Sequence, residues 1–424
     1  MGVDIEGALS FIHSVTWKGR KLGLGRVDAL LESLGGPHKK LKFIHIAGTN
    51  GKGSTASMLA HILEGSGYKT GLYTSPYIHK FNERMQINGS PISDSGLVAL
   101  TDEIRAYVSK MQDKPSEFEI ITAIAMLYFY NHNCDIVVLE VGLGGRLDTT
   151  NVIPVPEVAL ITPIGFDHTD LLGGALEEIA AEKAGIIKAG GDVISSPQEA
   201  GAARVIAKKC SEVNANISFV DANLIKPISQ NLDGQQFDFG GFKGLELALL
   251  GSYQLMNAAL AVSAVQLLQK KGWKVTEKDL RNGLKKATWP GRFEVMNKKP
   301  IFIVDGAHNP QGARAVVEGL SQLANGRKII FLIGVLADKG YPEMIEILAP
   351  VAKCFFVVTP DNPRALEAEV LSLKIMAYGL EATVCRSVGQ GVSMALGAAG
   401  GDGIACALGS LYLTGPLRDC FKGR

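Results

Sequence analysis

A glycine-rich run with one lysine and two hydroxyl side chains follows the apolar segment "FIHIA". Glycines let a backbone turn with its N–H groups pointing inward, and a helix that begins there favours a bound anion. The usual phosphate loop has a longer gap between its first glycine and the Gly-Lys pair, and the dinucleotide fingerprint G-x-G-x-x-G does not fit either. The alternative is an ordinary glycine-rich turn with a solvated lysine. We predict a nucleotide site made by Gly48, Thr49, Asn50, Gly51, Lys52, Gly53, Ser54 and Thr55.

An acidic residue, Glu140, ends the very apolar segment "DIVVLE". A carboxylate at the end of a buried strand is costly unless it has a partner. Open α/β sheets bind ligands at the carboxyl ends of their strands. We therefore predict that Glu140 holds a magnesium ion beside the phosphates. The alternative is a salt bridge to Arg146 or Lys52.

A second polar group follows the next apolar segment, in "ITPIGFDHTDLLG" (161–173). Asp167, His168 and Asp170 crowd one turn just past a strand's carboxyl end, so a ligand role is expected for the histidine. Lys183 then lies among apolar residues in "EEIAAEKAGIIK" (177–188). Its ordinary role would be that of a surface lysine whose alkyl stem packs on apolar neighbours.

The elements that must position these residues alternate between short apolar strands and helices. Continuous Val/Ile/Leu runs bounded by Gly and Pro predict buried parallel strands in a doubly wound, mostly parallel sheet. The predicted strands are 42–48, 69–75, 135–142, 158–164 and 192–196, and the predicted helices are 53–66, 94–112, 117–132 and 175–188.

The second half of the chain has a different order of elements. "FDFGGFKGLELALL", within 217–250, alternates with period two around Gly-Gly and predicts an antiparallel hairpin. Two predicted helices, 253–271 and 277–287, are followed by Trp, Pro and Gly, and we place the domain boundary there, near Pro290–Phe293. Strands and helices then alternate again in a smaller, Rossmann-like α/β domain. The predicted domains are therefore 1–292 and 293–424.

Composition excludes some classes of function. With 43 basic and 42 acidic residues and no basic stripe, the chain is not expected to bind nucleic acid. Six scattered cysteines without a C-x-x-C pair are typical of a reducing cytosol. No apolar run is long enough for a membrane span, and the first residues do not resemble a signal peptide. We expect a cytoplasmic monomer that acts on small molecules.

Eight motifs occur in an order that resembles the bacterial folylpolyglutamate synthase and dihydrofolate synthase family, within the Mur-ligase superfamily. The likeness covers essentially the whole chain, and "FNER" and "DHTDLLG" favour the folate branch over the peptidoglycan ligases. The motifs are "GTNGKGS" (48–54), "TSPYIHKFNERM" (74–85), "EVGLGGRLDTTN" (140–151), "DHTDLLG" (167–173), "EKAGIIK" (182–188), "GSYQLMNAALA" (251–261), "PGRFE" (290–294) and "DGAHNP" (305–310). Two departures are Tyr77, where the family usually has His, and Thr149, where Ala is commoner.

The resemblance implies an ATP-dependent acid–amino-acid ligase with ATP and Mg2+ as cofactors. ATP would phosphorylate a carboxylate of dihydropteroate or of a reduced folate, and the amino group of L-glutamate would attack the acyl phosphate. Implied catalytic residues are Lys52, Lys183, His168 and Glu140. Implied magnesium ligands are Ser75, Glu140, His168 and Lys183, the last as a carbamate.

The resemblance also implies ligand contacts outside the phosphate loop. Implied nucleotide contacts are Asn257, Arg292, Asp305 and His308. Implied acceptor contacts are Leu22, Gly23 and Leu24, the aromatic Phe118 with Glu119, and Leu147, Asp148 and Thr149. Phe118 could equally be a core residue of an amphipathic helix.

Three other functions stay open at the level of sequence. The first is an enzyme with only one of the two synthase activities. The second is a ligase of peptidoglycan precursors, which we expect to need an extra domain before a phosphate loop that here begins at residue 48. The third is a non-catalytic nucleotide switch, which would need neither Lys183 nor the polar turn around His168.

Overall fold

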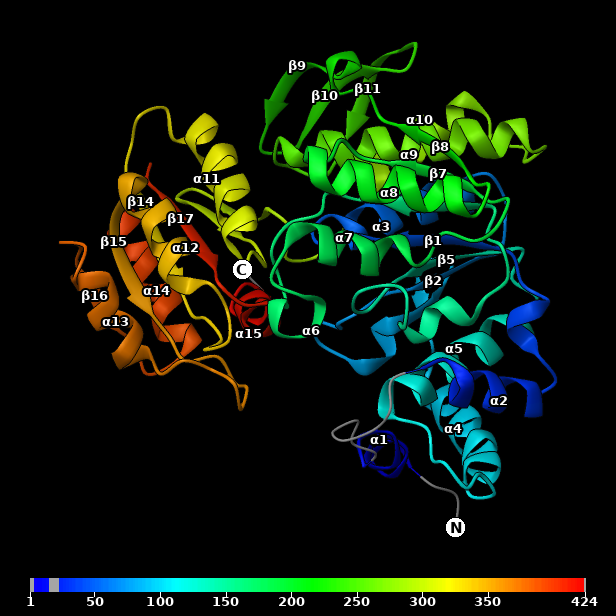
Figure 1. Cartoon of the computed structure of the whole chain (residues 1–424). Coiled ribbons are helices and arrows are strands. Elements are labelled where there is room, and N and C mark those ends of the chain that lie inside the picture. The colour runs from blue at the N-terminus through cyan, green and yellow to red at the C-terminus, as the bar shows by residue number, and fades with distance from the viewer. Residues whose placement is uncertain (1–3, 15–22, 423–424) are drawn as a thin grey trace. The chain divides into compact units, whose positions relative to one another are not determined.

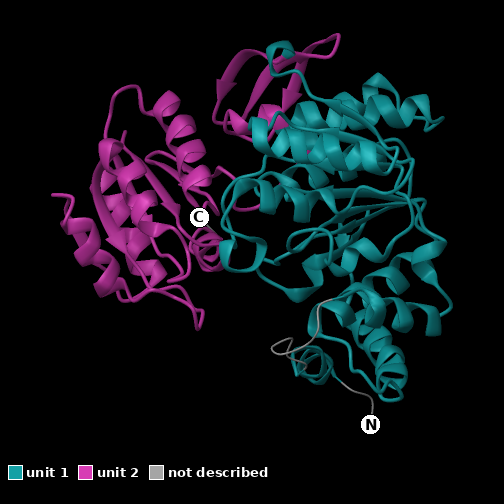
Figure 2. Ribbon diagram, viewed as in Figure 1, with its two compact units in different colours: residues 1–224, 257–286 teal, residues 225–256, 287–424 magenta. Residues whose placement is uncertain are grey.

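The structure is a computed structural model that describes residues 4–14 and 23–422 (Figure 1). The chain forms two compact units (Figure 2). Unit 1 holds residues 1–224 and 257–286, and unit 2 holds residues 225–256 and 287–424. This division differs from the predicted domains 1–292 and 293–424. The segment before the long helix joins unit 2 because Leu250 packs in one apolar cluster with Phe293, a contact between residues distant in the sequence.

Unit 1 is built on an eight-stranded sheet of order β4-β3-β2-β5-β1-β6-β7-β8. Six neighbouring strands run parallel, in the order β2-β5-β1-β6-β7-β8. Only the short β3 and β4 at one edge are antiparallel to their neighbours. Its strands are β1 (Phe43–Ala47), β2 (Thr70–Tyr73), β3 (Met85–Ile87), β4 (Ser90–Pro91), β5 (Ile136–Glu140), β6 (Val158–Ile161), β7 (Asp192–Ser195) and β8 (Asn216–Phe219).

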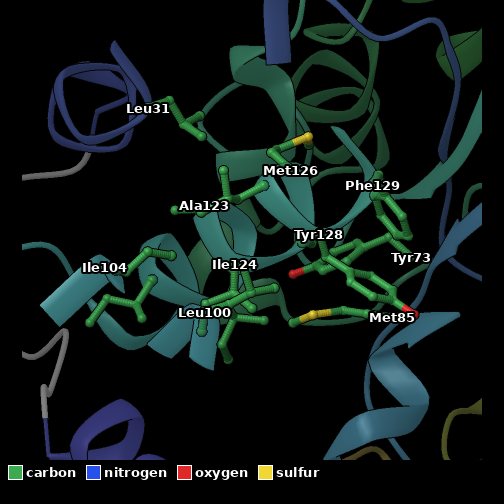
Figure 3. Close-up of a cluster of buried hydrophobic side chains, with 14 of the residues drawn as sticks. Leu31, Tyr73, Met85, Leu100, Ile104, Ala123, Ile124, Met126, Tyr128 and Phe129 are labelled. Atoms are coloured by element: carbon green, nitrogen blue, oxygen red, sulfur yellow. The ribbon is translucent and has the colours of Figure 1, made fainter. Parts of the chain in front are cut away.

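Helices cover both faces of this sheet (Figure 1). An apolar cluster between the sheet and α2, α4 and α5 includes Tyr73, Met126 and Phe129 (Figure 3). A second cluster packs α7 and α8 against β6 and β7. The helices are α1 (Ile5–His13), α2 (Gly25–Ser33), α3 (Lys52–Gly65), α4 (Asp94–Val108), α5 (Glu117–Asn131), α6 (Thr169–Leu172), α7 (Leu176–Ala184), α8 (Ala200–Glu212), α9 (Tyr253–Lys270, which starts in unit 2) and α10 (Glu277–Lys286).

Unit 2 contains a six-stranded sheet of order β12-β13-β17-β14-β15-β16. Only β12 is antiparallel, because it forms a hairpin with β13. Apolar clusters fill both faces, under α11 to α13 and under α14 and α15. The bounds are β12 (Glu294–Lys298), β13 (Ile301–Val304), β14 (Ile329–Ile333), β15 (Ala352–Val357), β16 (Ala382–Val384), β17 (Ile404–Leu408), α11 (Pro310–Ala324), α12 (Tyr341–Leu348), α13 (Ala368–Met376), α14 (Val388–Ala399) and α15 (Leu411–Asp419).

A separate antiparallel sheet in unit 2 contains the predicted hairpin. It consists of β9 (Lys226–Asn231), β10 (Gly234–Phe239) and β11 (Phe242–Leu247). Gly240 and Gly241, both with positive φ, join β10 to β11, as the Gly-Gly dipeptide predicted. The start of the predicted region is different, since β8 pairs in parallel with β7 in unit 1.

The predicted fold class is confirmed: a doubly wound, mostly parallel sheet and a second α/β domain. Among the described residues, no helix is both long enough and apolar enough to cross a membrane.

Candidate active site

The glycine-rich turn joins β1 to α3 at the carboxyl edge of the unit 1 sheet. Gly48 and Gly51 have φ values of +147° and +92°. A Cβ atom at Gly48 would overlap Thr162 Oγ1, and one at Gly51 would overlap Asn257 Oδ1. Both positions therefore need glycine for conformation and for space. Asn257, predicted as a nucleotide contact, lies directly against the loop.

Thr49 fastens this loop to the segment that follows β6. Its backbone N–H donates to Pro163 O at 3.0 Å, and its hydroxyl donates to Gly165 O at 2.9 Å. The same hydroxyl accepts from Gly165 N at 3.0 Å. Within the described residues, Thr49 thus uses its side chain to hold two loops together.

Lys52 is the first residue of α3 and curls back over the loop. Its Nζ donates to Gly48 O at 3.1 Å and to Thr49 O at 3.2 Å. Ser54 and Thr55 are buried in the first turn of the helix. Thr55 Oγ1 has no hydrogen-bond partner among the residues that the structure describes. A helix N-terminus with a lysine and inward-facing hydroxyls is suited to bind phosphate.

Lys183 on α7 reaches the same loop from another helix. Its side chain is 5% exposed, and its Nζ donates to Gly48 O at 2.9 Å. Burial lowers the pKa of Lys183 to about 7, and the nearby charge of Lys52 adds to the shift, against Asp167 and Asp148. The interpretation of Lys183 as a surface lysine is therefore wrong, because its amine is buried against the phosphate loop.

Glu140 ends β5, which lies between β1 and β2. The residue is 5% exposed, and its Oε2 accepts from Ser75 N at 3.2 Å. Arg146, one partner considered from the sequence, instead binds Glu182 at 2.7 Å. Because β1, β2 and β5 are neighbours, the sheet brings the phosphate loop, Ser75 and Glu140 to one edge.

His168 is the N-cap residue of α6 and has a left-handed conformation, with φ of +52°. Its backbone N–H donates to Asp167 Oδ1 at 2.9 Å, and its Nε2 lies 3.8 Å from the same oxygen. The imidazole is partly exposed. No group of three His, Cys, Asp or Glu ligands that includes Glu140 or His168 occurs in the described ranges.

Oxygen donors are present for the predicted magnesium ion. Mg2+ is usually bound through one or two carboxylates while it keeps several waters. Glu140 supplies a buried carboxylate, and burial of a carboxylate is costly unless a cation or donors compensate it. Ser75, held against that carboxylate through its backbone, can add a hydroxyl. The residues therefore fit a magnesium ion with few protein ligands.

The predicted acceptor residues lie around the start of α5 and the loop after β5. The Phe118 ring packs against Gly142, where a Cβ atom would overlap it, and forms an edge contact with Tyr73 at 6.3 Å between centroids. Glu119 caps α5 by accepting from Ser116 N, and it accepts from Arg26 Nε at 3.2 Å. Its Oε1 is buried and has no partner among the described residues.

Asp148 organises the loop that carries Leu147 and Thr149. Its carboxylate accepts from Leu143 N at 2.9 Å and from Thr150 N at 3.0 Å. Burial raises the pKa of Asp148, against the lowering effect of these hydrogen bonds. Thr149 Oγ1 is hydrogen-bonded to Thr122 Oγ1, and Leu147 is half-buried.

The "LGL" element is only partly described. Leu22 lies outside the described residues. Gly23 and Leu24 directly precede α2, and Leu24 packs against the apolar cluster of Figure 3.

Arg84 is a candidate that the sequence analysis did not single out. Its Nε and Nη1 atoms are buried and have no hydrogen-bond partner in the described part of the chain. The guanidinium lies 5.2 Å from the Tyr77 ring centroid and 5.5 Å from that of Phe81. Burial raises the pKa of Tyr73, while the charge of Arg84 opposes this shift. The signal was the arginine of "FNER", quoted above only as a family marker.

Unit 2 brings together three predicted nucleotide contacts. Asp305 follows β13, and its carboxylate accepts from Phe293 N at 2.7 Å, Ala307 N at 2.7 Å and Tyr253 Oη at 3.0 Å. Burial raises the pKa of Asp305, while Arg292 acts in the opposite direction. The Arg292 guanidinium lies against Gly306, and His308 Nδ1 is 2.8 Å from Gly306 O.

Comparison with known proteins places this geometry in a family. The model of the Mur ligase middle domain matches residues 46–265, and that of the Mur ligase glutamate ligase domain matches residues 291–411. The chain belongs to the Mur ligase family. It is 40% identical over 377 residues to a Bacillus subtilis protein named dihydrofolate synthase/folylpolyglutamate synthase, covering 86% of this chain and 87% of the relative.

Solved structures of this Mur ligase branch align with nearly the whole chain. Mycobacterium tuberculosis folylpolyglutamate synthase complexed with ADP has a TM-score of 0.90, with 31% identity, and covers 99% of this chain and 98% of its own. Escherichia coli FolC in complex with DHPP and ADP has a TM-score of 0.89, with 30% identity, and covers 99% and 98%. The expected family and the expected class, an ATP-dependent ligase, are therefore confirmed.

Proposed function

We propose that this Mur ligase adds L-glutamate to dihydropteroate and to reduced folates. ATP phosphorylates the acceptor carboxylate, ADP leaves, and the glutamate amine attacks the acyl phosphate to give an amide and phosphate. The observation that carries the proposal is the convergence of Lys52 and Lys183 on Gly48 O, beside the buried Glu140.

The phosphate loop supports the first step of the reaction. Phosphoryl transfer needs positioning and charge neutralisation more than a side-chain nucleophile. The N-terminus of α3 and Lys52 offer positive charge and amide donors to the ATP phosphates. Thr49 and Asn257 hold the loop in shape, and Ser54 and Thr55 offer hydroxyls.

We assign Ser75, Glu140 and His168 as the residues that would hold magnesium, together with Lys183 as a carbamate. The bound ion supplies charge neutralisation for the phosphates. A carbamate forms when a neutral lysine amine attacks carbon dioxide and loses one proton, which converts a cation into an anion. The lowered pKa of Lys183, about 7, supports this assignment because a large fraction of the amine is neutral near pH 7.

For the acceptor, we assign Phe118 as a stacking surface next to Leu147 and Thr149, with Gly23 and Leu24 at the entrance to α2. Glu119 and Asp148 act by shaping the site, since both accept backbone hydrogen bonds. The two unpartnered donors of Arg84 support a role in binding an anionic part of the acceptor or of glutamate. Arg292, Asp305 and His308 are the proposed nucleotide contacts of unit 2.

The proposal is tested by mass spectrometry of products made from Mg-ATP, L-glutamate and either dihydropteroate or tetrahydrofolate. Products that gain one glutamate from both acceptors would establish two activities. A product from tetrahydrofolate alone would assign folylpolyglutamate synthase activity only. A Lacticaseibacillus casei relative that is 38% identical is named for that single activity. Absence of product from both acceptors would overturn the proposal. Light scattering during size-exclusion chromatography tests the expected monomer.

A further inference from the structure

We propose that Asp28, Glu32 and His38 form a binding site for a divalent transition-metal ion such as Zn2+, distinct from the nucleotide site. The three residues come from α2 and the turn that follows it in unit 1. They form the one group of three possible His, Cys, Asp or Glu ligands, with ligand atoms within 4.8 Å of one another, in the described residues.

The local sequence "DALLESLGGPH" builds this group. Asp28 and Glu32 are four residues apart and therefore share one face of α2. Beyond the helix, Gly35 and Gly36 adopt positive φ values of +85° and +63°. Gly36 N donates back to Leu31 O at 2.9 Å, so the chain reverses before Pro37. The reversal brings His38 back over the acidic face of the helix.

The distances between the donor atoms suit ligands of one ion. His38 Nε2 lies 3.6 Å from Asp28 Oδ1 and 3.7 Å from Glu32 Oε1. Both distances are too long for good hydrogen bonds. Two ligands of a tetrahedral zinc ion, each bound at about 2.0–2.1 Å, lie about 3.4 Å apart. The two carboxylate oxygens lie within 4.8 Å of each other, and rotation of these half-exposed side chains can bring all three atoms to one ion.

The second observation is the histidine itself. His38 is 0% exposed, and neither ring nitrogen has a hydrogen-bond partner among the residues that the structure describes. Buried polar atoms are normally satisfied, and each exception calls for an explanation such as an ion. Burial lowers the pKa of His38, against Asp28 and Glu32, and so favours the neutral imidazole that binds metals.

The ligand types select the class of ion. One imidazole with two carboxylates suits zinc or a neighbouring transition metal better than magnesium, for which carboxylate, carbonyl and water oxygens are the preferred ligands. The side chains of Asp28 and Glu32 are 50% and 47% exposed, so water can complete the coordination. Lys39 Nζ lies 2.7 Å from Glu32 Oε1 and must release or share that oxygen.

A bound ion would fasten α2 to the segment that enters β1. The same helix carries Arg26, which binds Glu119 at the start of α5. The ion would therefore stabilise the helical layer beside the acceptor residues without taking part in the reaction.

The test uses the purified full chain without nucleotide, titrated with Zn2+ against a chromophoric chelator. The informative variant is Asp28→Asn with Glu32→Gln, because both side chains are half-exposed and nearly isosteric replacement should leave the fold intact. We expect zinc affinity to fall at least about tenfold. Asp102→Asn is the matched control, an acid on α4 with a side chain 41% exposed, and should bind zinc as the unmodified chain does.

His168→Asn separates this site from the nucleotide site. We expect one zinc ion to remain bound in His168→Asn and to be lost in His38→Asn and in the double variant. Zinc should also raise the melting temperature of the unmodified chain and of His168→Asn, but not that of the double variant. Equal zinc affinity in the double variant and the unmodified chain would overturn the proposal. Loss of zinc binding in His168→Asn but not in His38→Asn or the double variant would also overturn the proposal.

Discussion

At the scale of residues, two lysines from different helices donate to the same carbonyl oxygen, that of Gly48. Two amines at one oxygen repel each other when both are charged, so the charge of Lys52 helps to lower the pKa of Lys183. The proposed carbamate on Lys183 would replace this repulsion with an attraction.

Lys52→Ala should abolish turnover while the fold stays intact. The amine neutralises charge that develops on the transferred phosphoryl group, and loss of one such group typically costs about 10²–10³-fold in rate. Initial rates of ADP release measure the effect, and circular dichroism with thermal melting checks the fold. Near-normal activity would contradict the assignment of the phosphate loop.

Lys183→Met should stabilise the protein more at pH 6 than at pH 10. The pKa of Lys183 is about 7 in the folded chain against an ordinary 10.5, so the folded state binds fewer protons than the unfolded state between these values. The cost of the buried amine is therefore largest below pH 7 and falls as the pH rises toward 10.5. Melting temperatures of both proteins across this range measure it, and a pH-independent difference would argue against the lowered pKa.

Arg84→Met should weaken substrate binding more than it destabilises the fold. The guanidinium has two buried donors without partners, so its removal leaves no described acceptor unsatisfied. We expect KM for the acceptor or for glutamate to rise about tenfold or more, with KM for ATP unchanged. Arg105→Met is the matched control, because Arg105 lies on α4 and its guanidinium lies over the Phe11 ring of α1. An unchanged KM for both substrates would exclude Arg84 from binding.

At the scale of elements, neighbouring strands determine which loops meet. β5 lies between β1 and β2, so Glu140 is brought to the phosphate loop and to Ser75 although the three are distant in the sequence. This could be predicted from the rule that sheet ligands bind at strand carboxyl ends. The edge strands β3 and β4 were not predicted, because runs of three and two residues are too short for a periodic signal.

Gly48→Ala should disrupt the phosphate loop and remove most of the activity. The residue has a positive φ, and a Cβ atom there would overlap Thr162. Gly67→Ala is the matched control, because Gly67 also has a positive φ, +87°, but no atom within 4 Å of its added Cβ. Both variants carry backbone strain, but only Gly48→Ala adds the overlap, and it does so within the phosphate loop. Near-normal activity in Gly48→Ala, as expected for Gly67→Ala, would contradict the need for glycine at position 48.

Contacts made by single side chains were mostly beyond the reach of the sequence. The burial of Lys183 depends on where α7 packs, and its apolar neighbours fitted a surface helix equally well. Glu119 and Asp148 accept hydrogen bonds from backbone N–H groups, and these bonds depend on how the helix cap and the loop fold. By contrast, the need for glycine at positions 48 and 51 followed from the motif itself.

At the scale of the whole molecule, the division into two units follows packing rather than chain order. The three-stranded sheet β9–β11 precedes α9 in the sequence, yet it belongs to unit 2. The Trp-Pro-Gly sequence near Pro290 indicated one place where the chain passes from one unit to the other. The passages after residues 224 and 256 have no comparable sequence signal. The two family models match residues 46–265 and 291–411, so the first match extends over parts of both units.

The most direct test of the proposed reaction follows oxygen from the acceptor carboxylate. Tetrahydrofolate or dihydropteroate labelled with 18O in the reacting carboxylate is incubated with Mg-ATP and L-glutamate, and the phosphate is analysed by mass spectrometry. An acyl phosphate passes one carboxylate oxygen to phosphate when the amine attacks, so we expect phosphate that carries one 18O atom for each amide formed. Unlabelled phosphate released together with the amide would contradict it.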